Sequence, residues 1–276
     1  MLVDCGTDGS YKDGLKKRIE KLAKSDRHFE LFMMSHIDFD HIGGAIPFLQ
    51  EAPALGVSFG DVWFNGWKHI ASMLGGKQGE QFSALIVDNQ LPWNEWKNGK
   101  GVDKGKAIVR LGGSLPTITL PGGMLLTLLS PTKEKLAALA PKWTADLEDW
   151  GTKPGDLDAA RSHLLGKHPS TSENVDELAD APFKSDPAEP NGSSIAVLAE
   201  YGGKSVLLGA DAHAPVLVEA LKILAKSRGL AKLPVTAFKV PHHASQNNLN
   251  IELMKLLDCK HYLISTNGGT FNHPDR

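Results

Sequence analysis

The sequence is short of cysteine and has no long apolar run. Its two cysteines, Cys5 and Cys259, lie far apart in the chain and form neither a CxxC motif nor a short disulfide framework. We therefore expect core thiols in a reducing compartment, and a cytoplasmic protein. No window approaches the roughly 18 uninterrupted apolar residues of a membrane helix. The amino terminus does not have the pattern of a signal peptide.

The sequence also lacks an excess of charge of either sign. Its 30 basic and 32 acidic residues leave a net charge of −2, so no global positive field would attract nucleic acid or an anionic membrane. A polyanionic substrate would have to be held locally, by metal ions and a few side chains. With 276 residues, of which 41% are hydrophobic, the chain can bury one large core, or one core plus a substantial insertion.

Against this background, four residues with metal-binding side chains stand within six positions. They directly follow the apolar run 29–34, which predicts a buried strand. Because the backbone turns where such a strand ends, neighbouring side chains can converge there on one or two cations. A solvated helix-capping turn is the alternative, and it accounts for each residue singly but poorly for the set. The predicted ligands are His36, Asp38, Asp40 and His41.

Two later segments end on side chains of the same kind. The runs 195–201 and 204–211 predict two strands, joined by two glycines in a hairpin, and the second strand ends on Asp211. A carboxylate has two oxygens and can contact two cations at once, whereas the alternative for Asp211 is a cap on a turn or helix. A further strand leads to the run Pro-His-His-Ala-Ser at 241–245.

The run His-Ile-Asp-Phe-Asp-His at 36–41 resembles the first metal motif of the metallo-β-lactamase fold hydrolases, which is usually His-x-His-x-Asp-His. Asp38 replaces the second histidine, and in this the chain looks like the hydrolase domain of ComEC-type competence DNA-uptake proteins. The resemblance spans Leu2 to Pro274 apart from an insertion. It implies an α/β fold, a four-layer αββα sandwich lacking some terminal strands, in a single domain over 1–276.

Within that domain we expect a helical insertion at 133–190. Its composition predicts helices at 133–139, 144–150, 156–165 and 174–178, each separated from the next by a proline. Two interpretations stay open. The insertion is either a lid that selects substrate or a helical excursion without a role in the reaction.

The resemblance also implies roles for single residues. Asp211 matches the Gly-Asp whose carboxylate bridges two metals, and Asn191 stands where many relatives have a further histidine ligand. Residues 241–245 resemble Pro-His-His-Gly-Ser, in which one histidine ligates the second metal. We favour His243, and His242 would support it or contact substrate. The implied substrate contacts are Asn65, Asn191 and Ser245.

A last predicted strand, 262–269, precedes Phe-Asn-His-Pro at 271–274. The same branch has a comparable Asn-x-x-x-His-Pro. His273 is therefore a candidate general acid or phosphate contact, with a structural loop histidine as the alternative.

Together these features predict a binuclear metal-dependent hydrolase that uses two divalent cations. Asp38 shifts the preference from zinc toward manganese or magnesium without excluding zinc. The catalytic residues would be Asp40, which orients the attacking water, and His273 or His242, which protonates the leaving oxygen. A carboxylate-rich site suits a phosphodiester or nucleic-acid substrate, hence a phosphodiesterase or nuclease. Hydrolysis of a carboxylic ester, lactone or thioester, and an inactive metal-binding regulatory module, are the alternatives.

Overall fold

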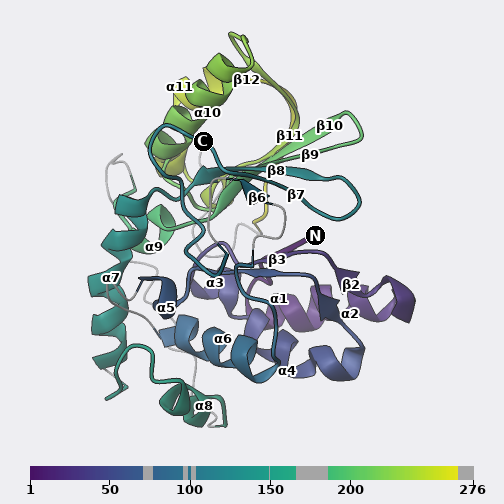
Figure 1. Ribbon diagram of the computed structural model, residues 1–276, viewed down its shortest axis with the longest axis vertical. Coiled ribbons are helices and arrows are strands. Elements are labelled where there is room, and N and C mark those ends of the chain that lie inside the picture. Colours follow the sequence, from purple (N-terminus) through teal and green to yellow (C-terminus); the bar gives the residue numbers. More distant parts are fainter. Residues whose placement is uncertain (71–76, 96–98, 101–103, 149, 166–185, 267–276) are drawn as a thin grey trace. The chain divides into compact units, whose positions relative to one another are not determined.

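The computed structural model describes residues 1–70, 77–95, 99–100, 104–148, 150–165 and 186–266. The chain forms two compact units (Figure 1). The first contains Met1–Lys97, Val102–Ile108 and Leu136–Lys167, and the second contains Asn98–Gly101, Val109–Lys135 and His168–Arg276. Within the described ranges, none of the helices combines the length and the apolar character needed to span a membrane. The single domain over 1–276 and the insertion at 133–190 stay predictions.

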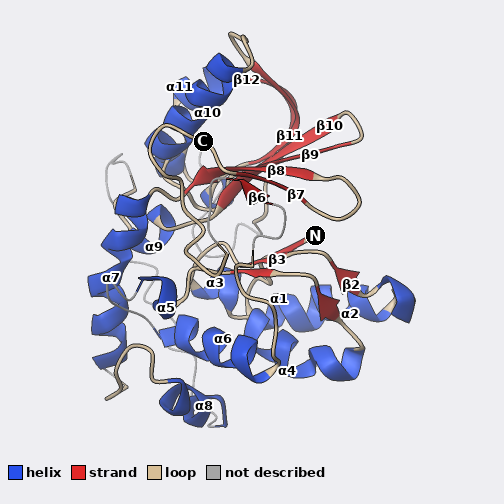
Figure 2. Cartoon of the chain, in the orientation of Figure 1, coloured by secondary structure: helices blue, strands red, loops and turns tan. Residues whose placement is uncertain are grey.

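The first unit contains two small parallel sheets with helices packed against them (Figure 2). In one sheet β3 (Phe32–Met33) lies between β1 (Leu2–Val3) and β5 (Val62–Trp63), and in the other β2 (His28–Phe29) pairs with β4 (Ser58–Phe59). A π-helical turn, Tyr11–Leu15, joins the first two helices. The helices are α1 (Asp8–Ser10), α2 (Lys16–Glu20), α3 (Phe39–Ile42), α4 (Ala45–Leu55), α5 (Trp67–Ile70), α6 (Lys77–Asp88), most of α7 (Lys133–Glu148) and α8 (Leu157–Leu165).

The core of the first unit is aromatic. Phe32 on β3 contacts Phe48, Phe59 and Phe82 with ring centroids 5.7, 5.3 and 5.8 Å away. Such pairs contribute about 0.5–1.5 kcal/mol each beyond the burial of their area. The strands β1, β3 and β5 are therefore held firmly, and because they are parallel, the residues that follow them lie at one edge of the sheet.

The second unit is built on a seven-stranded mixed sheet of order β12-β11-β10-β9-β8-β7-β6. The strands β10, β11 and β12 are parallel to one another, and the remaining neighbours are antiparallel. The strands are β6 (Gly99–Lys100), β7 (Thr117–Thr119), β8 (Leu125–Ser130), β9 (Ala196–Tyr201), β10 (Lys204–Leu208), β11 (Leu233–Lys239) and β12 (Leu257–Leu263). The helices are α9 (Glu189–Gly192), α10 (Ala214–Ser227) and α11 (Ile251–Lys255), with short 3-10 turns at His242–Ala244 and Gln246–Asn248.

Helices α10 and α11 cover one face of this sheet (Figure 1). The buried side of α10 includes Leu217, Leu221 and Leu224, which belong to one apolar cluster with Leu207 and Phe238 of the strands. Full burial of such a side chain stabilises by roughly 1.5–3 kcal/mol. This packing fixes the sheet from which the second set of polar residues extends.

The strand directions determine where those polar residues lie. Because β10, β11 and β12 are parallel, Asp211, His242 and Ser265 all follow strands that end at the same edge. Strand β9 is antiparallel to β10, so Asn191, which precedes β9, belongs to this edge too. The predicted fold class, an α/β fold with sheets and helices in both units, is confirmed.

Candidate metal centre

In the first unit, the residues that follow β1 and β3 form one hydrogen-bonded group. The Asp4 carboxylate accepts hydrogen bonds from the Ser35 backbone N–H and the Ser35 hydroxyl, both at 2.7 Å. It also lies 2.8 Å from Nδ1 of His41. Because a carboxylate can only accept, Nδ1 of His41 carries the proton, and the lone pair of this ring is on Nε2.

His36 is oriented through the same serine. The Ser35 hydroxyl hydrogen is used on Asp4, so the Ser35 oxygen accepts from Nδ1 of His36, 3.0 Å away. Both imidazoles are buried, and both present Nε2 as an acceptor. A histidine whose Nδ1–H is held by a carboxylate or hydroxyl is the usual arrangement of a metal ligand.

Each of these Nε2 atoms is close to a carboxylate of the same motif. Nε2 of His36 lies 3.5 Å from Oδ2 of Asp38, and Nε2 of His41 lies 3.8 Å from Oδ2 of Asp40. Among the described residues, Asp38 makes no side-chain capping bond to α3 although it stands at the N-cap position. These two nitrogen–oxygen pairs fit divalent cations, and they count against the alternative of a capping turn.

Burial and the neighbouring positive charge shift the pKa of Asp4 in opposite directions. Burial raises its pKa, but the neighbouring His41 and the hydrogen bond from Ser35 outweigh burial, and the pKa lies below the ordinary value. Asp4 therefore stays ionised and continues to hold His41.

In the second unit, Asp211 follows β10 through Ala210, which has a φ of 45°. Its backbone N–H donates to the Ser194 hydroxyl at 3.3 Å, and its side chain is buried. The left-handed residue turns the chain sharply, so the carboxylate comes out at the edge of the sheet instead of continuing along the strand.

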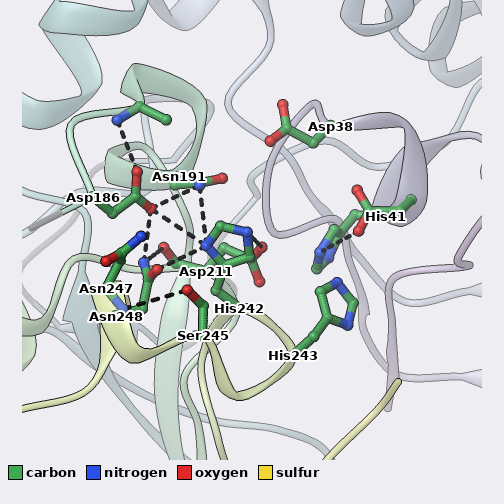
Figure 3. A network of polar contacts seen from close by, with 12 residues as sticks. Asp38, His41, Asp186, Asn191, Asp211, His242, His243, Ser245, Asn247 and Asn248 are labelled. Atoms are coloured by element: carbon green, nitrogen blue, oxygen red, sulfur yellow. Dashed lines mark hydrogen bonds and ion pairs between the residues drawn. The ribbon is translucent and has the colours of Figure 1, made fainter. Parts of the chain in front are cut away.

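His242 lies next to Asp211, and two other residues contact its Nδ1 atom (Figure 3). Nδ1 of His242 is 2.7 Å from the Asn248 Oδ1 atom and 3.5 Å from the Asp186 Oδ2 atom. Nε2 of His242 is 4.0 Å from the Asp211 Oδ2 atom. The imidazole thus stands between two carboxylates. Burial lowers the pKa of His242, but Asp186 and Asp211 raise it further, to about 9.

Asp186 is a buried carboxylate with several donors. It accepts from the Ala188 backbone N–H at 2.9 Å and from the side-chain amides of Asn191 and Asn248, both at 2.8 Å. Burial raises the pKa of Asp186, yet these hydrogen bonds and His242 bring it below its ordinary range. Asp186 is therefore ionised and fixes the groups around it.

The other residues predicted in this region have definite positions. Nδ1 of His243 donates to the Ser265 carbonyl. Ser245 is buried and accepts from the Asn247 backbone N–H at 3.3 Å. Asn191 donates to Asp186, and among the described residues its buried Oδ1 atom has no hydrogen-bond partner. That oxygen is suited to a cation or to a substrate donor.

Asn65 and His273 are the last two predicted site residues. The Asn65 side chain donates to the Ile108 carbonyl at 2.9 Å and accepts from the Ile108 N–H at 2.7 Å. Its amide is thus used within the first unit, and a substrate contact by Asn65 stays a prediction. His273 lies outside the described residues.

The sequence interpretation missed four residues that orient the others: Asp4, Ser35, Asp186 and Asn248. For Asp4 a signal was present, because it ends the first apolar strand and a polar residue in that place faces the next strand end. Asp186 and Asn248 gave no such signal. They lie 62 positions apart in the chain, and only folding brings their side chains together.

Comparison with protein families gives a match over most of the chain. The sequence model of the metallo-beta-lactamase superfamily matches residues 1–268. The chain belongs to the metallo-β-lactamase superfamily. Members of this superfamily are mostly metal-dependent hydrolases, and the histidine and aspartate donors of this chain suit the divalent metals that such proteins usually bind. No curated protein matches the chain.

Proposed function

We propose that this superfamily member is a binuclear metal-dependent phosphodiesterase or nuclease. Six residues would hold two divalent cations, zinc or manganese with magnesium as a further candidate: His36, Asp38, Asp40, His41, Asp211 and His243. The observation that carries the proposal is the pairing of each Nε2 in the first motif with a carboxylate, at 3.5 Å for His36 and 3.8 Å for His41. Such oxygen-rich donor sets suit phosphoryl groups.

When bound, the two cations would lower the pKa of a shared water and polarise the scissile phosphodiester. The protein's own side chains would orient the water and the ligands and supply the proton. The exposed Asp40 accepts a hydrogen bond from the attacking water and orients it, while Asp4 and Ser35 keep His41 and His36 in the ligand tautomer. His242 or His273 gives a proton to the leaving oxygen. Asn65, Asn191 and Ser245 are the proposed substrate contacts.

The likeness of the first motif and of residues 241–245 to ComEC-type DNA-uptake proteins supports a nucleic-acid substrate. With a net charge of −2, the chain would bind such a polyanion through the metal centre and not through a global field.

An activity assay tests the proposal. Purified protein is given a chromogenic phosphodiester, single-stranded DNA or a lactone, each with Mn²⁺ or Zn²⁺. We expect turnover of a phosphodiester, and a loss of at least about a hundredfold in kcat/KM for Asp40→Ala and Asp211→Ala, which is about 2.7 kcal/mol of transition-state stabilisation. Asp13→Ala is the matched control, because this carboxylate is 84% exposed and pairs with Lys17.

The other outcomes of this assay point elsewhere. Turnover of the lactone alone would assign an ester or lactone hydrolase. DNA binding without cleavage under either metal, with the metals retained, would assign an inactive regulatory module.

Removal of metal gives a second prediction, independent of turnover. A chelator should lower the melting temperature of the wild type, because a cation that binds only the folded state stabilises it by about 2.7 kcal/mol at one hundred times its Kd. Asp40→Ala should respond less. Differential scanning calorimetry with and without added Mn²⁺ measures this, and identical melting curves for the wild type would contradict the proposed metal centre.

A further inference from the structure

Asp186, Asn248 and His242 are joined by a chain of hydrogen bonds, called the relay below (Figure 3). The donor and the acceptor of each of its bonds follow from the chemistry of the three side chains. Asp186 can only accept hydrogen bonds, so the Asn248 amide must turn its NH2 group toward it. That nitrogen donates to Asp186 Oδ2 at 2.8 Å and to the Asp211 backbone carbonyl at 3.0 Å. Both donors of Asn248 are then used, and both go to groups that cannot donate.

The orientation of the Asn248 amide determines that of His242. With its nitrogen turned to Asp186, Asn248 presents Oδ1 to Nδ1 of His242, 2.7 Å away. Nδ1 must therefore be the donor, and Nε2 is directed to the Asp211 carboxylate at 4.0 Å. The relay thus sets both the direction of the ring and the nitrogen that faces Asp211.

We propose that Asp186 and Asn248 are positioning residues that make His242 a metal ligand beside Asp211. This inference rests on the proposed function and changes two parts of it. His242 becomes a ligand in addition to His243, where the sequence favoured one of the two, and His273 is then left as the proposed general acid. The buried Oδ1 atom of Asn191, which has no hydrogen-bond partner among the described residues, belongs to a side chain bonded to Asp186. A cation near Asp211 and His242 would satisfy it.

A purely structural role for the same relay makes a different prediction. Asp186 and Asn248 join the segment before α9 to the turn after β11, so their loss could simply loosen the unit. A loosened unit would bind both cations less well and would melt earlier. A positioning role affects the affinity for one cation and leaves the other unchanged.

The test measures metal affinity and not turnover. Wild type, Asp186→Asn and His242→Gln are titrated with Mn²⁺ and Zn²⁺ against a chromogenic chelator, and their melting temperatures are recorded. We expect two cations in the wild type. In Asp186→Asn one of the two Kd values should rise ten- to a hundredfold, because an amide at 186 can donate as well as accept, and only the Asp211 carbonyl then holds the Asn248 amide in the direction that serves His242. His242→Gln should raise the Kd of the same cation.

Two further variants sharpen the test. Asp258→Asn is the matched control, since this exposed carboxylate on β12 takes no part in the relay and should leave both Kd values unchanged. The double variant Asp186→Asn with Asn248→Asp exchanges amide and carboxylate, which restores an acceptor for Nδ1 of His242. It should recover part of the lost affinity.

Each outcome decides the matter. Wild-type affinity for both cations in His242→Gln would overturn the inference, even if Asp186→Asn failed to fold. An equal rise of both Kd values with a lower melting temperature in Asp186→Asn would overturn it in favour of a structural role. Absence of metal binding in the wild type would overturn the proposed function and this inference with it.

Discussion

At the scale of single residues, three helices differ in the residue type that occupies the left-handed position at their carboxyl end. Helices α4, α6 and α10 end in the same way, with a left-handed residue followed by a hydrogen bond back to the last turn. That residue is Gly56 after α4 and Gly229 after α10, but Gln90 with a φ of 52° after α6. Beyond α6, Gln90 N–H donates to Val87 and Leu91 N–H to Ile86, which is the Schellman arrangement.

The difference between these helix ends predicts a stabilising substitution. A left-handed φ costs an L-residue roughly 1–2 kcal/mol and glycine almost nothing, while glycine loses more chain entropy on folding. Gln90→Gly should therefore raise the free energy of unfolding by about 1 kcal/mol, measured by urea denaturation. The converse variant is the control: Gly229→Gln should lose a similar amount. A loss of stability in Gln90→Gly would show that the side chain of Gln90 matters more than its backbone.

At the scale of elements, α7 departs from the sequence prediction. The prolines predicted separate helices at 133–139 and 144–150, yet α7 runs without a break over Lys133–Glu148 with Pro141 inside it. The helix continues because one side of it is buried. Trp143 lies against Gly79 of α6, where a Cβ atom would come within 2.4 Å of the indole ring, and its Nε1 donates to Glu80 at 3.3 Å. Tertiary contacts here outweigh the local cost of proline.

Replacing Pro141 should recover the stability that a proline inside a helix costs. Proline inside a helix removes one hydrogen bond and clashes with the preceding turn, at about 3 kcal/mol or more in a free helix. Pro141 is exposed, so Pro141→Ala should stabilise the protein by about 1–3 kcal/mol without disturbing the core, read as a higher melting temperature. Pro47 lies in the first turn of α4, where no N–H is needed, and Pro47→Ala should change little. Equal effects of the two variants would contradict this account.

The helical spacing of Leu15, Ile19, Leu22 and Ala23 predicts a helix at 12–24, and the same comparison applies to it and to the predicted helix at 174–178. The first helical segment begins earlier and runs from Asp8 through the π-helical turn to Glu20. Thr7 explains the early start, because its side chain accepts from the Ser10 N–H and caps the helix. Residues 174–178 lie outside the described residues.

At the scale of the whole molecule, the half-buried His69 makes the stability of the fold depend on pH. His69 on α5 packs edge-on against Trp93, and its Nε2 is 3.3 Å from the side-chain nitrogen of Asn94. Burial, with a smaller effect of Lys68, lowers the pKa of His69 from 6.5 to about 3. Since Asn94 donates to it, the folded state holds this imidazole neutral.

The sign of the pH effect follows from proton binding. Between about pH 6.5 and 3 the unfolded chain binds a proton at His69 that the folded state does not, so the free energy of unfolding falls as the pH falls through this window. The loss is at most about 1.4 kcal/mol per pH unit. His69→Gln, which keeps an acceptor for Asn94 and cannot titrate, should flatten this part of the curve in urea denaturation at pH 7, 6 and 5. Parallel curves for the two proteins would exclude His69 as the source.

The sequence by itself determined the types of the candidate ligand residues and the strand ends that they follow. Apolar runs followed by histidine and aspartate predicted the metal motif at 36–41, Asp211 and the histidine pair, because strand periodicity and ligand chemistry are local properties of a chain. The resemblance of the motif at 36–41 to a known family predicted the mixed α/β fold.

Only the tertiary structure decided how those ligands are oriented. Asp4 reaches His41 across 37 positions, and Asp186 reaches Asn248 across 62, and no local pattern encodes which residues these contacts join. Which nitrogen of each imidazole faces outward depends on these partners, because a ring has two nitrogens and its neighbour selects between them. The residue types could therefore be predicted from the sequence, but their orientation required the folded chain.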